Sequence, residues 1–164
     1  MLICAITGST GVLGSKIKKF LPYKFYEFKG DIRNKKIVEQ WVLKKDFDIL
    51  IHLAAVVPTN LVKKDYKTAY DINVNGTRYL ADSVIKKKNK PKWFFFSSTS
   101  HVYRLSNKFK KITERSKLKP FSRYGKTKLS AEKILIKKFK KSEIKLCVGR
   151  IFSFTDKKQK IPFV

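Results

Sequence analysis

Cysteine, arginine and acidic residues are all scarce in this chain of 164 residues. The two cysteines, Cys4 and Cys147, each lie within an apolar run, which predicts buried thiols in a reducing compartment rather than a disulfide framework. The longest apolar stretch, 49–58, contains His52 and falls far short of the ~20 residues that a membrane helix needs. The N-terminus lacks the basic segment of a signal peptide. We therefore expect a cytoplasmic protein without a membrane span.

Acidic residues number only 12 against 39 lysines and arginines, which gives a formal net charge of +27. Such a charge suggests nucleic-acid binding. However, only six of the basic residues are arginine, which base and phosphate recognition favours, and the lysines are scattered along the whole chain. We interpret the charge as a solvated surface, so nucleic acid is not the expected partner, and we keep a polyanion-binding protein as an alternative.

Hydrophobic residues make up 43% of the chain, which is enough for one core in a chain of this length. Short apolar runs alternate along the sequence with segments of helical periodicity. Continuous runs separated by helices are typical of a parallel sheet buried on both faces. We predict one α/β domain with a doubly wound parallel sheet and helices on both faces. The predicted strands are 2–7, 24–28, 48–55, 93–98 and 145–151, and the predicted helices begin near 12, 37, 65 and 122.

Three of the seven glycines lie in the stretch TGSTGVLG at 7–14, between the first predicted strand and the first predicted helix. Glycines at such a junction let the backbone turn tightly and approach a pyrophosphate, which then meets the free N–H groups of the helix. The G-x-x-G-x-x-G spacing differs from G-x-G-x-x-G, but its place in an alternating α/β pattern predicts nucleotide binding. The alternative is a turn whose glycines serve packing alone.

The stretch YGKTK at 124–128 places a phenol and an ammonium four residues apart, on one face near the start of a helix. A nearby cation stabilises a phenolate, which makes Tyr124 a candidate acid-base catalyst and Lys128 its partner. Of the seven tyrosines, only Tyr124 has a lysine four positions later. The alternative is a surface tyrosine beside an incidental lysine.

Hydroxyl side chains end the fourth predicted strand, in the stretch SSTSHVY at 97–103. Ligands of open parallel sheets bind at the carboxyl ends of the strands, so we expect these hydroxyls in the same crevice. Thr99 is a candidate to hydrogen-bond a substrate oxygen as charge develops on it. The alternative is that these residues are ordinary turn formers, and we interpret His101 as structural.

These motifs together resemble the extended short-chain dehydrogenase/reductase family, in particular its NAD-dependent nucleotide-sugar epimerases, dehydratases and reductases. The resemblance covers the chain from Leu2 to about Thr155 and keeps the family's motif order. Besides the three stretches above, it rests on GDIR at 30–33, HLAA at 52–55, NVNGT at 73–77 and RIFS at 150–153.

The resemblance implies a Rossmann fold and hydride transfer between a sugar carbon and a nicotinamide cofactor, with no metal site. Tyr124 would be the acid-base catalyst, Lys128 would bind the nicotinamide ribose, and Thr99 would orient the sugar oxygen. Either Glu27 or Lys29, at the end of the second strand, would distinguish NAD from NADP, and we lean to NAD. The residues implied to bind the cofactor are Gly8, Thr10, Gly11, Val12, Leu13, Gly14, Asp31 (on the adenine), Ile32, Leu53, Ala54, Ala55, Asn73, Tyr124 and Lys128.

Family members carry a further region of similar size that holds the nucleotide-sugar substrate. We therefore expect residues 1–155 to form an NAD(P)-binding domain and 156–164 to begin a truncated substrate region. The chain is then either a truncated gene product or one that a partner chain completes, and the unfinished edge of the sheet favours association into a homo-oligomer. The alternative is a catalytically silent NAD(P)-binding module.

Overall fold

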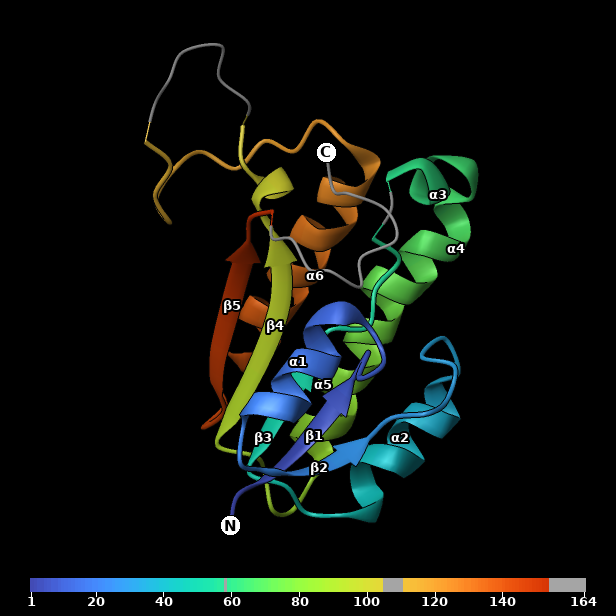
Figure 1. The fold of residues 1–164 in the computed structure, drawn as a ribbon, viewed down its shortest axis with the longest axis vertical. Helices are drawn as coiled ribbons and strands as arrows, with labels where there is room; N and C mark the ends of the chain where they lie inside the picture. Colours follow the sequence, from blue (N-terminus) through green and yellow to red (C-terminus); the bar gives the residue numbers. More distant parts are fainter. Residues whose placement is uncertain (58, 105–110, 154–164) are drawn as a thin grey trace.

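The computed structural model describes residues 1–57, 59–104 and 111–153. Within these ranges it contains one five-stranded sheet with helices on both faces, which confirms the predicted α/β fold (Figure 1). The strands are β1 (Ile3–Thr7), β2 (Lys24–Glu27), β3 (Ile49–His52), β4 (Trp93–Thr99) and β5 (Lys145–Ile151). The α-helices are α1 (Val12–Phe20), α2 (Lys35–Lys44), α3 (Thr59–Lys64), α4 (Tyr66–Tyr70), α5 (Gly76–Lys86) and α6 (Arg123–Phe139).

The strand order is β2-β1-β3-β4-β5, and every pairing is parallel. The direction of winding reverses at β1, because the chain first moves outward to β2 and then crosses back to β3. In open parallel sheets a crevice forms at such a switch point, outside the carboxyl ends of the strands. The segments that follow β1 and β3 therefore face each other across this crevice.

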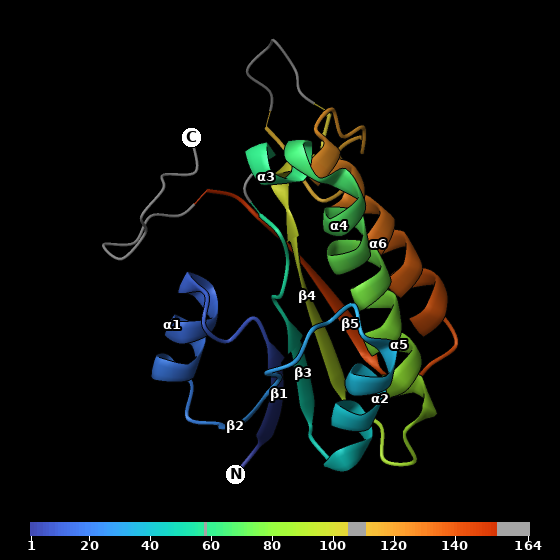
Figure 2. The ribbon, with the colours of Figure 1, turned by 90° about the vertical axis from the view of Figure 1, so that its right-hand side faces the viewer.

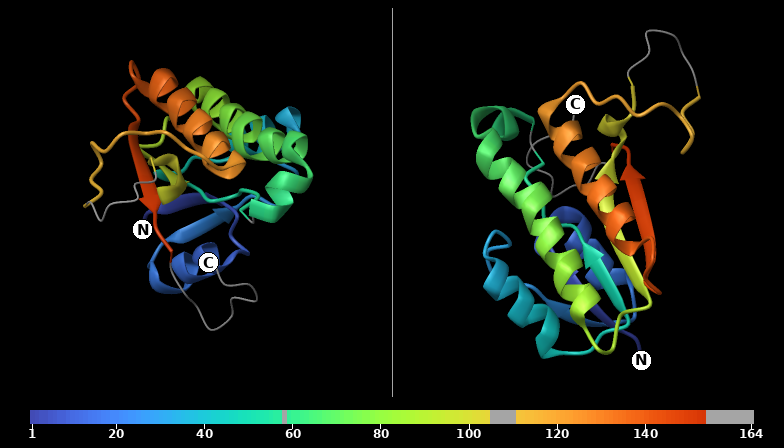
Figure 3. Two further views of the ribbon diagram at one scale, coloured as in Figure 1. Left: turned by 90° about the horizontal axis from the view of Figure 1, so that it is seen from above. Right: turned by 180° about the vertical axis from the view of Figure 1, so that it is seen from behind.

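The two faces of the sheet are covered unequally (Figures 2 and 3). Helices α2, α5 and α6 pack on what we call the helix-rich face, where Phe94 and Phe96 of β4 lie in one core with Leu80 of α5 and Leu135 of α6. Within the described ranges, α1 alone covers the opposite face, which we call the α1 face, and Ile17 packs there against β1 and β3. Most of the buried apolar surface thus lies on the helix-rich side.

The α1 face is open over β4 and β5 in the part of the chain that the structure describes (Figure 1). In the sheet register, Trp93 lies beside Lys145 and Phe95 beside Cys147. The side chain of Trp93 is 45% exposed, and Cys147 is exposed as well. The prediction of two buried thiols is therefore right for Cys4 and wrong for Cys147, because α1 reaches only the β1 and β3 half of this face.

The segment that we predicted as one helix starting near 65 has three parts, and the short helix α3 precedes it. Helix α4 begins after Asp65, whose side chain caps it by accepting a hydrogen bond from the Thr68 backbone nitrogen. A π-helical turn, η1 (Asp71–Asn75), then leads into α5. Such turns widen the helix locally and are frequent at functional sites. The predicted substrate region at 156–164 lies outside the described residues.

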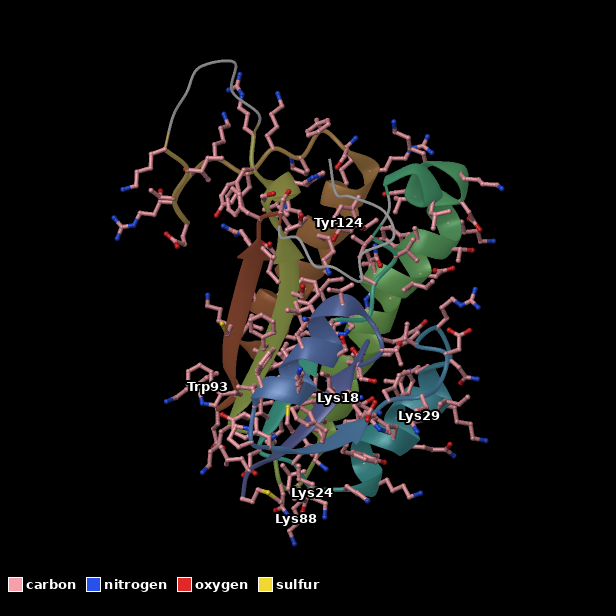
Figure 4. All side chains as sticks on the ribbon, viewed as in Figure 1. Lys18, Lys24, Lys29, Lys88, Trp93 and Tyr124 are labelled. Carbon is pink, nitrogen blue, oxygen red and sulfur yellow. The ribbon has the colours of Figure 1, made fainter. Side chains whose placement is uncertain are left out.

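Among the described residues, Lys87 and Lys128 are buried, and the other basic side chains are exposed or partly exposed, as predicted for a solvated charge. Figure 4 labels Lys24 on β2, Lys29 just after β2 and Lys88 after α5, and all three are exposed. Among the described residues, no helix combines the length and apolar character needed to cross a bilayer.

Candidate active site

The glycine loop follows β1 and leads directly into α1. Gly8 has a φ of +70°, in the left-handed region that favours glycine, and a Cβ there would lie 2.7 Å from the Ala54 backbone nitrogen. A Cβ on Gly14 would lie 2.3 Å from the carbonyl oxygen of Gly8. A Cβ on Gly11 would meet the same oxygen at 3.5 Å, an ordinary contact. Gly8 and Gly14 therefore close the loop against the protein, whereas a Cβ at Gly11 would fit without a clash.

The first turn of α1 presents backbone N–H groups at this loop. The helix begins at Val12 with Gly11 as its N-cap, and no side chain caps it. Leu13 and Gly14 lie in the same turn. The first N–H groups of a helix lack partners inside the helix and carry its positive dipole end, so they suit a phosphate group.

A cavity of about 530 Å³ lies beside the loop at the carboxyl ends of β1 and β2. Of the residues that the resemblance assigns to the cofactor, the cavity is lined by Gly8, Thr10, Asp31, Ile32 and Ala54. Its other lining residues are Ser9, Glu27, Phe28, Lys29, Gly30, Arg33 and Ile72. The assigned residues outside this lining are Gly11, Val12, Leu13, Gly14, Leu53, Ala55, Asn73, Tyr124 and Lys128. Our sequence-based assignment missed Phe28 and Ile72, because apolar residues outside a motif carry no signal for binding.

The cavity contains charges of both signs. Glu27 ends β2, and hydrogen bonds from the Ser9 side chain and from Lys18, at 2.9 Å, lower the pKa of its carboxyl. Asp31 accepts hydrogen bonds from the exposed Arg33 guanidinium, which lower the pKa of that carboxyl too. Both candidates for distinguishing the cofactor ribose, Glu27 and Lys29, line the cavity.

A buried histidine joins the tips of β1 and β3 to α5. His52 is 1% exposed, with Nδ1 2.7 Å from Thr7 Oγ1 and Nε2 2.8 Å from Thr77 Oγ1. Thr77 donates its hydroxyl proton to the Asn73 carbonyl, so it accepts from His52, and the imidazole is neutral with its proton on Nε2. Burial, aided by the charge of Lys128, lowers the pKa of His52 to about 3. His52 is therefore a positioning group in the resting protein.

The side chain of Asn73, in the π-helical turn, connects the segment after β3 to α6. Its Oδ1 accepts from the Val56 backbone nitrogen at 2.8 Å, and its Nδ2 donates to Thr127 Oγ1 at 3.1 Å. Thr127 in turn donates to the Tyr124 carbonyl oxygen at 2.8 Å. Asn73 thus fixes the start of α6 relative to the strand tips. These partners are far apart in sequence, which is why spacing alone could not predict the network.

Tyr124 lies in the first turn of α6, near the tip of β4. Ser122 caps this helix by accepting a hydrogen bond from the Gly125 backbone nitrogen at 2.9 Å. Gly125 packs so closely that a Cβ there would lie 2.4 Å from the His101 carbonyl oxygen. Burial raises the pKa of Tyr124 to about 12, although a hydrogen bond with the Thr99 side chain opposes this. The structure therefore brings Thr99 and Tyr124 together, with a phenol that is protonated at neutral pH.

Lys128 lies one turn further along α6 and is 2% exposed. Its Nζ lies 4.3 Å from the centre of the Phe96 ring. Among the described residues, no hydrogen-bond acceptor contacts this ammonium group. Burial lowers the pKa of Lys128 to about 7, partly opposed by the negative charge of Glu132. A buried cation without an acceptor is costly, so this site favours a ligand that supplies hydroxyl or phosphate oxygens.

These features fit a dinucleotide. The loop at Gly11 and the first turn of α1 suit a pyrophosphate, and the cavity next to them suits a nucleoside. At the other end of the crevice, the unsatisfied Lys128 ammonium suits ribose hydroxyls, and Tyr124 lies one helical turn away on α6.

Comparison with known proteins agrees with this geometry. A model of the NAD dependent epimerase/dehydratase family matches residues 4–157, and the chain belongs to this family. The chain is 35% identical over 132 residues to a UDP-glucose 4-epimerase of Lactobacillus helveticus, a match that covers 79% of this chain and 38% of that protein. The chain therefore spans well under half the length of this curated relative.

Solved structures show the same fold. The dTDP-4-dehydrorhamnose reductase of Bacillus anthracis, in complex with NADP, superposes with a TM-score of 0.78 at 25% identity, covering 94% of this chain and 56% of that one. The protein RMD of Pseudomonas aeruginosa, complexed with NADPH, superposes with a TM-score of 0.88 at 21% identity, covering 98% and 57%. The fold described above thus corresponds to a little over half of each of these chains.

Proposed function

We propose that this chain binds NAD(P) across the strand tips and carries the acid-base group of a nucleotide-sugar epimerase, dehydratase or reductase. The observation that carries the proposal is the buried Lys128 ammonium, which finds no acceptor among the described residues, one helical turn from Tyr124. The glycine loop and its cavity support binding of the remainder of the dinucleotide. Family membership supports the reaction class.

The bound cofactor would supply the hydride chemistry, and the residues of this chain would handle the proton. Tyr124 would exchange its phenol proton with a sugar oxygen, while Thr99 holds that phenol through its hydrogen bond. Lowering the pKa of Tyr124 from about 12 to near neutrality requires about 7 kcal/mol of differential stabilisation. The Lys128 ammonium and the positive nicotinamide ring would supply it together, so the tyrosine becomes a base only in the complex.

We further propose that NAD is the preferred cofactor. The carboxylate of Glu27 lies at the end of β2 and lines the cavity, and a carboxylate at this place repels a 2′-phosphate. Titration with NADH and NADPH under the same conditions tests this preference. Tighter binding of NADPH would reverse it and assign the 2′-phosphate to Lys29 and Arg33, which line the same cavity.

The remaining substrate pocket would come from polypeptide outside the described residues, from a completing chain or from a second copy. We propose that residues 1–155 act as the NAD(P)-binding domain, that 156–164 begin the substrate region, and that the protein works in the cytoplasm, where Cys4 and Cys147 stay reduced. Turnover of a nucleotide-sugar by this chain alone, at a rate equal to that of a full-length relative, would contradict the need for a completing segment.

The decisive test combines coenzyme titration with a tyrosine substitution. Tyr124→Phe should keep the NADH affinity of the parent. In a preparation supplied with the missing region of a relative, it should lower turnover of UDP-glucose by about 10²-fold or more, because the phenol proton is lost. Tyr23→Phe, at the residue before β2, serves as the matched control and should keep both the NADH affinity and the turnover.

Each outcome separates the alternatives. If neither coenzyme bound at millimolar concentration, the proposal that this chain binds NAD(P) would be contradicted. Binding without turnover, in a preparation supplied with the missing region of a relative, would favour the silent NAD(P)-binding module. Salt-dependent retention on nucleic acid without coenzyme binding would favour a polyanion-binding protein.

A further inference from the structure

A second charged residue of α6, Glu132, is buried deeper than its charge would favour, and the proposed chemistry does not use it. Glu132 is 1% exposed on the helix-rich face of the sheet. Its carboxylate accepts from Arg150 Nη2 at 2.8 Å and from Arg150 Nε at 3.1 Å, and it accepts a short hydrogen bond from Ser98 Oγ. One side chain of α6 is thus tied to β4 and to β5.

Arg150 is itself held on its far side. Its Nη1 donates to the Tyr103 hydroxyl at 3.1 Å and to the Glu114 carbonyl oxygen at 3.2 Å. Hydrogen bonds to the Glu132 carboxylate raise the pKa of Arg150, so the guanidinium keeps its proton. The guanidinium and the carboxylate therefore stay fixed, and the carboxylate cannot turn toward other partners.

Glu132 follows Lys128 by four residues on α6, so both side chains lie on one face of the helix, one turn apart. The Lys128 ammonium interacts electrostatically with Glu132 on α6 and with His52 on β3. Tyr124 lies one turn before it on α6, and Arg150 on β5 contacts the Glu132 carboxylate. His52 is neutral and Tyr124 is protonated near neutral pH. Glu132 is therefore the negative charge that acts on Lys128 in the resting protein.

We propose that Glu132 is a positioning residue for Lys128: anchored by Arg150 and Ser98, it holds α6 against β4 and β5 and supplies the negative charge that keeps the buried ammonium ionised for the cofactor. This inference rests on the proposed function, because it assumes that Lys128 contacts bound NAD(P). It assigns a role in cofactor binding to an ion pair that lies outside the crevice.

The pH dependence of NADH affinity tests the proposal. In the parent protein, affinity should fall as the pH rises through about 7, since Lys128 then loses its proton. Tyr124 titrates far above this window and His52 far below it, at about 12 and about 3. Glu132→Gln should move the midpoint of this fall down by about one pH unit. Glu132→Asp keeps the charge, so its midpoint should stay nearer that of the parent.

A purely structural role predicts something else. Glu132→Gln would then lower the melting temperature and weaken NADH binding equally at every pH. The pH midpoint of the fall in NADH affinity would stay where it is in the parent, and this result would overturn the proposal. If Glu132→Gln does not fold, the double variant Glu132→Gln/Arg150→Met removes both members of the buried ion pair, so neither is left without its partner, and it allows the same measurement. Its midpoint should also move down, and an unmoved one counts equally against the proposal.

Lys128→Met separates this inference from the proposed function. Loss of the pH-dependent fall in Lys128→Met, together with an unmoved midpoint in Glu132→Gln, overturns the role of Glu132 alone. An unchanged NADH affinity and pH profile in Lys128→Met overturns the contact between Lys128 and the cofactor, and with it both proposals.

Discussion

The two ends of the proposed cofactor crevice are built in different ways. The loop end, comprising the glycine loop at 8–14 and the cavity beside it, consists largely of backbone and of exposed or half-exposed charges such as the Lys18–Glu27 pair. The tyrosine end consists of Thr99, Tyr124 and Lys128 with the His52 network, and there the polar side chains are buried.

This difference separates two physical principles. At the loop end, function depends on side-chain atoms that are absent, because glycine lets the backbone pack closely and leaves room for a ligand. At the tyrosine end, function depends on desolvation, which moves the pKa of Lys128 down to about 7 and that of Tyr124 up to about 12. Substitutions at the two ends should therefore impair cofactor binding for different physical reasons.

The largest expected effect comes from adding one methyl group at the loop end. Gly11→Ala should fold with nearly the stability of the parent, since its Cβ meets only an ordinary contact at 3.5 Å. It should nevertheless weaken NADH binding by about 10²-fold or more, because the methyl group occupies space that the pyrophosphate needs. Fluorescence titration with NADH and urea denaturation measure the two effects separately.

Gly14→Ala is the matched comparison within the same loop. Its Cβ would lie 2.3 Å from a backbone oxygen, so the loop must shift, and the free energy of unfolding should fall by about 1–3 kcal/mol. Equal NADH affinity in Gly11→Ala and the parent would show that the pyrophosphate does not lie over the loop.

Much of the loop end could be predicted from the sequence, because it depends on local features. Glycine spacing between a strand and a helix indicates a turn that is followed by free helix N–H groups. The pairing of Tyr124 with Lys128 on one helix face was also predictable, since it follows from helical periodicity. The five strands could be predicted for the same reason, since each is a continuous apolar run.

The tyrosine end was less predictable, because burial depends on residues far apart in the chain. Thr7 and His52 are 45 residues apart, and no spacing rule links them. A helix face shared by Tyr124 and Lys128 does not reveal that Lys128 would be 2% exposed. The prediction that Cys147 is buried was wrong for a related reason, because an apolar strand is covered on both faces only where other elements reach it.

A smaller effect, at the tyrosine end, concerns acid stability. The folded protein holds His52 with a pKa of about 3, whereas the unfolded chain binds that proton near pH 6.5. Stability should therefore be lost as the pH falls below 6.5 toward 3, by up to about 1.4 kcal/mol per pH unit from this group. In His52→Gln this contribution to the slope should vanish, at a cost of about 1–3 kcal/mol at pH 7 for the broken hydrogen bonds.

Urea denaturation between pH 4 and 7.5 measures how steeply the free energy of unfolding falls with pH in the parent, in His52→Gln and in His101→Gln. His101→Gln is the control, because the half-buried His101 lies outside the His52 network, and it should keep the steep loss in acid. An equally steep slope in His52→Gln would mean that His52 is not the group held neutral by burial.

The smallest effect is expected for an ion pair at the loop end. Lys18→Gln removes a partner of Glu27 in a pair whose side chains are 29% and 27% exposed, so the free energy of unfolding should fall by less than about 1 kcal/mol. Because the folded protein lowers the pKa of Glu27, the contribution is present at neutral pH and is lost as the pH falls through that pKa. Salt at about 1 M should nearly abolish the difference from the parent in urea denaturation. If Lys18→Gln lowered the free energy of unfolding as much as His52→Gln does, and salt did not change this, the contrast between a solvated loop end and a desolvated tyrosine end would be wrong.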